Sequence, residues 1–203
     1  MLDEAGRRRV AEAIRAAEAR TTGEIVCIVA REASSYRSWA IFLAAAVGFA
    51  APGFLIVFTS WGPAPVWMAQ LAAAALAGGA LLWRPLRLAL TPQFLKRERA
   101  CEAARRQFAA RGLQATAGRT GVLVFVAVSE RHVEVIPDEG VAALAGEAAW
   151  RAAVEDLVTA IRAGRVAEGM EQVVTRIGAI LAEHFPAAPG ETRNELPDHV
   201  IML

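Results

Sequence analysis

The sequence predicts an α/β domain whose small, helix-covered sheet is interrupted by a two-helix transmembrane hairpin. Residues 40–59 and 66–83 are two long runs without a charged side chain. Residues 25–29 and 122–128 are unbroken apolar runs rich in β-branched residues, which is typical of strands buried on both faces. The flanking segments place apolar residues at helical spacing, so we expect helices to cover that sheet.

The two uncharged runs match the bilayer, because about 20 apolar helical residues cross roughly 30 Å of hydrocarbon. A short Gly/Pro-rich turn at 60–65 joins them, and we expect spans at about 39–60 and 65–83. A buried helix pair in a soluble core is the weaker alternative, since long soluble helices normally carry a polar stripe. Tryptophans, which favour the headgroup layer, stand at or near the span ends: Trp39, Trp61, Trp67 and Trp83.

The basic residues near the spans predict the orientation. All lie on the outer flanks and none in the turn: Arg31 and Arg37 before the first span, and Arg84, Arg87, Lys96, Arg97 and Arg99 after the second. By the positive-inside rule, we expect a multi-pass protein with both termini cytoplasmic and the lipid bilayer as a partner.

The overall charge gives no sign of a nucleic-acid partner, because 22 Lys and Arg nearly balance 21 Asp and Glu. The cysteines Cys27 and Cys101 lie in apolar or amphipathic segments. We interpret both as packed thiols in a reducing compartment, in preference to a disulfide or a metal pair.

The hairpin is expected to be an insertion within one domain. Residues 1–38 hold a helix and one strand, which cannot bury that strand alone. Residues 84–187 supply the remaining elements: a helix ending near Gly112, a polar flexible connection over 113–120, strands at 121–128 and 132–136, and two helices before Phe185. Residues 188–203 form a polar tail, whose last residues, 200–203, are candidates for a short strand.

Catalytic motifs are absent from the sequence: there is no Cys-x-x-Cys, His-x-x-x-His or Gly-x-Ser-x-Gly, and we assign no catalytic residue. His132, His184 and His199 are interpreted as surface histidines. The metal candidates are Asp138, Glu139 and Glu24, because carboxylates hold hard cations such as calcium or magnesium. The favoured alternative is turn chemistry, with Asp138 in the turn and Gly140 supplying a positive φ. Glu24 would then cap neighbouring amides.

Several segments resemble the TPM domain family. They are Thr22-Gly23-Glu24-Ile25, Thr120-Gly121 with the strand to Val126, the hairpin Glu130–Val135, Phe185-Pro186 and the closing Asn194-Glu195-Leu196-Pro197-Asp198. The inserted hairpin is similar to that of a bacterial membrane-protein branch. The hydrolase-like branch usually has Asn where Arg119 and Thr120 stand here, and more acidic residues after the second hairpin strand.

The resemblance therefore implies fold and membrane context more than catalysis. We expect an interaction or assembly module at the bacterial inner membrane, with no required cofactor, which binds or assists a membrane protein or complex. The alternative is a divalent-cation-dependent phosphatase that uses Asp138, Glu139 and perhaps Glu24.

Overall fold

The computed structural model describes residues 2–116, 118–142, 147–187 and 199–203. The chain divides into two compact units. Unit 1 comprises Met1–Ser34 and Arg97–Leu203, and unit 2 comprises Ser35–Lys96. Each unit is described separately.

Unit 1 is built on a four-stranded sheet in the order β3-β2-β1-β4. The strands are β1 (Glu24–Ala30), β2 (Gly121–Ala127), β3 (His132–Pro137) and β4 (Ile201–Met202). β1 runs parallel to β2 and β4, while β3 is antiparallel to β2. Every residue of β1 and β2 is buried. The helix-covered sheet predicted from the two apolar runs is therefore confirmed, and the tail supplies its short edge strand β4.

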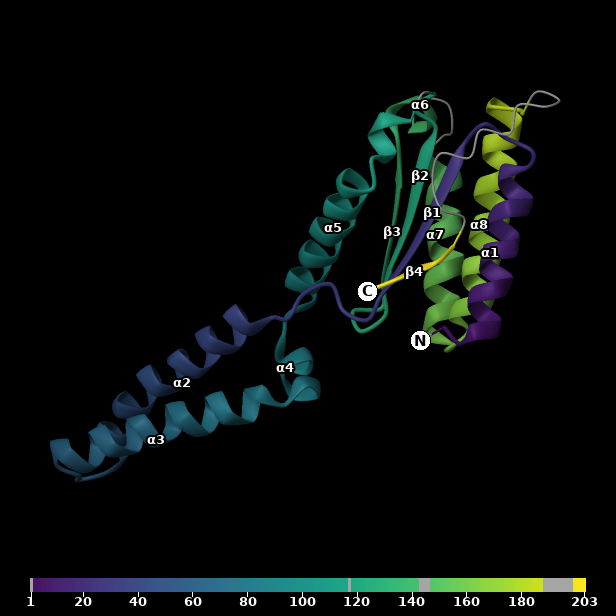
Figure 1. The fold of residues 1–203 in the computed structure, drawn as a ribbon. Coiled ribbons are helices and arrows are strands. Elements are labelled where there is room, and N and C mark those ends of the chain that lie inside the picture. Colours follow the sequence, from purple (N-terminus) through teal and green to yellow (C-terminus); the bar gives the residue numbers. More distant parts are fainter. Residues whose placement is uncertain (1, 117, 143–146, 188–198) are drawn as a thin grey trace. The chain divides into compact units, whose positions relative to one another are not determined.

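Three helices cover one face of this sheet (Figure 1): α1 (Glu4–Glu18), α7 (Glu147–Arg162) and α8 (Val166–His184). Asp3 caps α1, because its side chain accepts a hydrogen bond from the amide of Gly6 at 2.7 Å. α8 packs directly on α1, where a Cβ placed on Gly178 would lie 2.4 Å from Cβ of Ala17. The helices approach closely because position 178 has no side chain.

The opposite face is covered by α5 (Gln93–Ala110), of which residues 97–110 belong to unit 1 (Figure 1). Ala100 and Ala104 are fully buried against Phe125 and its neighbours in the sheet. A 3₁₀ turn, η1 (Leu113–Ala115), follows. The prediction of a flexible connection from 113 is wrong at its start: Leu113 is fully buried and packs at Gly121. The short helix α6 (Glu139–Ala142) follows β3.

Unit 2 contains α2 (Arg37–Phe58), α3 (Pro63–Leu82) and α4 (Arg84–Leu90). α2 and α3 form a hairpin, with Gly48 against Ala74. Both helices are long and apolar enough to cross a membrane, with mean hydropathy values of 2.4 for α2 and 1.5 for α3. Only 6% and 11%, respectively, of their most apolar 18-residue stretches are buried. The ranges of the two helices differ by only one or two residues from the ranges expected from the sequence, about 39–60 and 65–83. Their large side chains face outward: Phe49, for example, is 87% exposed.

Candidate functional site

An acidic turn lies at the end of the sheet where β1 and β2 begin. Glu24 pairs with Gly121 in the register, and Asp138 follows β3 at the same end. The amide of Asp138 donates to the carbonyl of Gly121 at 2.8 Å. Glu24 and Asp138 are both buried, with 4% and 6% exposure. The fold thus brings these two predicted carboxylates to the same end of the sheet.

The Asp138 carboxylate has two different environments. Its Oδ1 accepts a hydrogen bond from the amide of Glu139 at 2.8 Å. Its Oδ2 is buried and has no hydrogen-bond partner among the described residues. A buried acceptor without a partner costs free energy, so this oxygen is where the turn has unused binding capacity.

Glu139 has a different environment. Its side chain is 82% exposed and pairs with Arg119. Within the described residues, the acidic turn does not bring three ligand atoms close enough to share one cation. A cation bound at the turn would thus need water or further groups besides these carboxylates.

Gly140 is required by a close backbone approach. A Cβ at this position would lie 2.6 Å from the carbonyl oxygen of Arg119. The expectation that Gly140 supplies a positive φ is wrong, because the described glycines with positive φ are Gly112 and Gly164. Steric exclusion, and not left-handed backbone, fixes glycine in this turn.

A second cluster lies between α5 and β3 and consists of Cys101, His132 and Glu134. The Cys101 thiol donates to Glu134 Oε2 at 3.3 Å, and His132 Nε2 lies 2.9 Å from the same oxygen. Cys101 Sγ and His132 Nε2 are 3.7 Å apart. Of the residues that the structure describes, these three make the one group close enough to hold a metal ion. We call this group the CHE cluster.

The strand geometry explains why two members of the CHE cluster point the same way. His132 and Glu134 are two residues apart on β3, so they share a face. They pair with Ala127 and Phe125, which belong to the core under α5. Sequence reasoning placed His132 on a solvent-exposed surface, and this is wrong. Its side chain is only 19% exposed and stands on the face of the sheet that α5 covers.

Ionisation in the CHE cluster is shaped by burial and by mutual contact. Burial raises the pKa of the Cys101 thiol, and the negative charge of Glu134 raises it further, while Arg97 and Arg105 oppose this. The hydrogen bond from His132 lowers the pKa of Glu134 against the opposing effect of burial. Cys27, in contrast, is fully buried in β1, and desolvation raises the pKa of its thiol strongly. Both cysteines are free, and Cys27 is packed as predicted.

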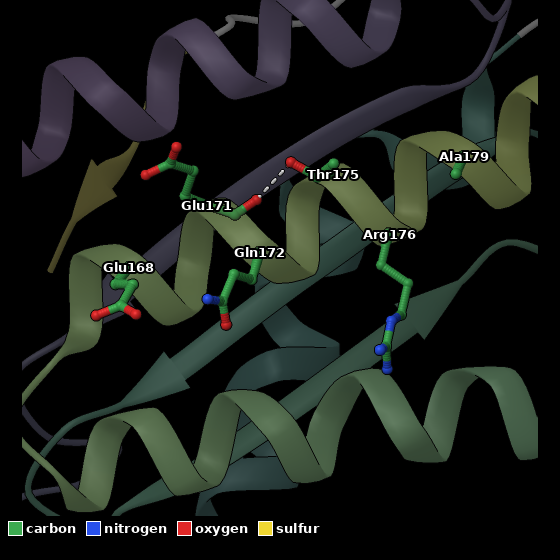
Figure 2. Close-up of a pocket in the computed structure, with 6 residues that line it drawn as sticks. All are labelled: Glu168, Glu171, Gln172, Thr175, Arg176 and Ala179. Carbon is green, nitrogen blue, oxygen red and sulfur yellow. Dashed lines mark hydrogen bonds between the residues drawn. The ribbon is translucent and has the colours of Figure 1, made fainter.

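The outer surface of α8 carries a pocket of about 490 Å³ lined by Glu168, Glu171, Gln172, Thr175, Arg176 and Ala179 (Figure 2). All these residues come from one helix. Arg176 already pairs with Asp156 of α7 at 2.8 Å, and Glu168 pairs with Arg165 at 2.9 Å. The pocket therefore shows no convergent set of polar groups of the kind that ligand sites present.

Comparison with known proteins identifies related sequence and fold. Residues 85–180 match the family model of the TPM domain. No curated protein matches this chain. Among solved structures, the fold is similar to the NMR structure of the BA42 protein from the psychrophilic bacterium Bizionia argentinensis. The two share 17% identity with a TM-score of 0.62, and the match covers 100% of this chain and 96% of that one.

The matched residues include β2 and β3, which were among the segments expected to carry the resemblance. Three other parts of the resemblance lie outside this range: Thr22–Ile25 precedes it, and Phe185-Pro186 and Asn194–Asp198 follow it. The last of these also lies outside the described residues. At 17% identity, the likeness to BA42 concerns the fold alone. Residues 85–180 thus match the TPM domain family, and the fold of the chain is similar to that of the BA42 protein.

Proposed function

We propose that this chain is a TPM-domain protein, that α2 and α3 anchor it in the bacterial inner membrane, and that it acts there as an interaction or assembly module. The observation that carries the proposal is the apolar surface of unit 2. Large apolar side chains, whose contact with water is unfavourable, are exposed on both helices. Among them are Phe49 (87% exposed), Val57 (74% exposed) and Leu76 (75% exposed). A lipid bilayer is the environment in which such a surface is stable.

The charges at the hairpin support a specific orientation. The turn between α2 and α3 has no charged residue, whereas Arg31, Arg37, Arg84 and Arg87 flank the helices on the other side. Such a distribution favours both termini in the cytoplasm. Unit 1 would then stand on the cytoplasmic side, where a membrane protein or a complex is the partner we propose.

The topology is tested with reporters. In a bacterial host, we expect a green fluorescent protein fused after Leu203 to fluoresce, and an alkaline phosphatase fused there to be inactive. Alkaline phosphatase inserted in the turn at Gly62 should be active, because the turn lies outside. All three fusions should stay in the membrane fraction after an alkaline carbonate wash. An active phosphatase after Leu203, or release by the wash, would contradict the proposed anchor.

A second candidate function is a divalent-cation-dependent phosphatase. The observation that favours it is the buried, unpartnered Oδ2 of Asp138, which is an available ligand for magnesium or calcium. Glu24 begins β1, which β2 separates from β3, at the same end of the sheet, and it would be the next carboxylate to take part.

The two functions are separated by turnover of a generic phosphate ester with magnesium or calcium. The interaction module predicts no turnover by the purified full chain. The enzyme predicts a cation-dependent rate that Asp138→Asn lowers by about 10²–10³-fold, the usual cost of losing one stabilising group at a developing charge. Glu168→Gln is the matched control, because this side chain pairs with Arg165 on α8, outside the acidic turn, and its loss should change that rate little. Such a rate with such a loss would replace the first proposal.

A further inference from the structure

We propose that Cys101, His132 and Glu134 form a binding site for a borderline-soft divalent cation, Zn²⁺. The site is distinct from the acidic turn. His132 pairs with Ala127 at the hairpin end of β2 and β3, whereas Asp138 follows β3 at its other end. The inference does not depend on the membrane anchor or on any phosphatase activity.

The three ligand atoms already have nearly the required spacing. A tetrahedral Zn²⁺ with bonds of about 2.0–2.3 Å holds its ligand atoms roughly 3.3–3.6 Å apart. Cys101 Sγ lies 3.3 Å from Glu134 Oε2 and 3.7 Å from His132 Nε2. The nitrogen and the oxygen, at 2.9 Å, are hydrogen-bonded and would separate slightly. A point equidistant from these three atoms lies about 1.9 Å from each, so an ion just outside their plane reaches normal bond lengths.

The chemistry of the ligands selects the class of cation. A thiolate and an imidazole favour zinc over calcium and magnesium, which prefer sets made entirely of oxygen. Glu134 adds a carboxylate whose charge, together with a Cys101 thiolate, balances a doubly charged cation. On binding, the Cys101 thiol, which now donates a hydrogen bond to Glu134, releases its proton to the solvent, and the thiolate sulfur takes the metal bond.

The cluster is held by regular structure. His132 and Glu134 stand on one face of a strand that is paired along its length with β2, and Cys101 stands on α5 near two fully buried alanines, Ala100 and Ala104. The cation would tie α5 to β3. Ligands on rigid elements need little rearrangement to bind, which favours affinity.

Three protein ligands leave one tetrahedral position for water or another ligand. The side chains of His132 and Glu134 are 19% and 30% exposed, so solvent reaches this position. A structural zinc site usually closes all four positions with protein groups. The CHE cluster therefore has the ligand count of a site that exchanges its fourth ligand.

The competing interpretation is a hydrogen-bonded trio that only joins α5 to β3. Cys101→Ser distinguishes the two, since a serine hydroxyl can still donate to Glu134 but is a poor ligand for zinc. If the trio is only structural, the variant should resemble the parent in every measurement, and neither should bind the metal.

The test uses the full chain in detergent, freed of metal by a chelator and titrated with Co²⁺ as a spectroscopic substitute for Zn²⁺. We expect saturable binding with a thiolate-to-cobalt charge-transfer band and visible bands of tetrahedral strength. Zn²⁺ should remove these bands, whereas an excess of Mg²⁺ should not. Zn²⁺ should also raise the melting temperature, because a ligand that binds only the folded state stabilises it.

The variants assign the ligands. Cys101→Ser should abolish the charge-transfer band although Cys27 remains. His132→Gln and Glu134→Gln should each weaken binding by more than about 10²-fold, since even groups that only orient a ligand contribute 10–100-fold. His184→Gln and Glu102→Gln are the matched controls and should bind like the parent. The proposal is overturned if the parent gives no saturable band, or if Cys101→Ser retains it.

Discussion

Truncating Phe125 to alanine should destabilise the sheet by about 3–5 kcal/mol, the usual cost of removing a fully buried phenyl group and leaving a cavity. Phe125 is 1% exposed and stands in the middle of β2. Its ring faces α5, where the neighbouring residues include the small alanines Ala100 and Ala104. These side chains have no length with which to refill the space, so the cost should lie in the upper part of that range.

The loss is measured by amide hydrogen exchange of the β1 and β2 segments in the full chain in detergent. Because exchange is followed segment by segment, it reports the stability of unit 1 separately from that of the apolar helices. A loss of 3–5 kcal/mol corresponds to exchange faster by at least about 10²-fold, at 1.36 kcal/mol for each factor of ten. Phe108→Ala is the matched control: Phe108 is only partly buried against the same core and should cost less. Equal effects at both positions would contradict the packing described for this face.

The central strands could be predicted from the sequence because burial on both faces leaves no place for a polar residue. Val26 and Ile28 face α5, while Ile25, Cys27 and Val29 face the other helices, and the run reads as continuously apolar. The two long apolar helices, α2 and α3, were predictable for a related reason. A run of some 20 apolar residues is long enough to cross a bilayer, and composition alone reveals such a run.

The CHE cluster could not be predicted in the same way, because it depends on which face of β3 the helix α5 covers. Cys101 and His132 are 31 residues apart, and their meeting follows from tertiary packing. A local signal was present: His132 and Glu134, at positions i and i+2, share one strand face. That face was taken to be in solvent. The strand alternation was correct, but the sequence did not show that α5 lies above it.

The acidic turn shows a similar limit. Asp138 was recognised as a turn residue and Glu24 as the start of a buried strand, and both are correct. Whether Asp138, Glu139 and Glu24 hold a cation stays a prediction. The role of Gly140 was misassigned, since the close approach of the Arg119 carbonyl depends on a neighbour 21 positions earlier in the chain and leaves no trace in local turn chemistry.

The α1–α8 contact is the second place where one side chain should have a large effect. Gly178→Val should destabilise unit 1 by about 3 kcal/mol, the upper end of the usual cost of overpacking. Even the first added carbon would lie 2.4 Å from Cβ of Ala17 and 3.2 Å from its Cα. Since the Ala17 methyl is fixed to the backbone of α1, no rotation relieves the contact, and the helices must separate. Thermal unfolding and exchange of the α1 and α8 amides would both report the loss.

The control is an exchange of the two small residues across the contact. Ala17→Gly combined with Gly178→Ala keeps one methyl group in the same gap, and the helix propensities of the two substitutions, each about 1 kcal/mol, oppose each other. The double variant should therefore recover most of the stability, while Gly178→Ala alone should not. A strong coupling between the two positions is expected because they are in direct contact. If Gly178→Val instead melts like the parent, the close approach of α1 and α8 is not what requires glycine at this position.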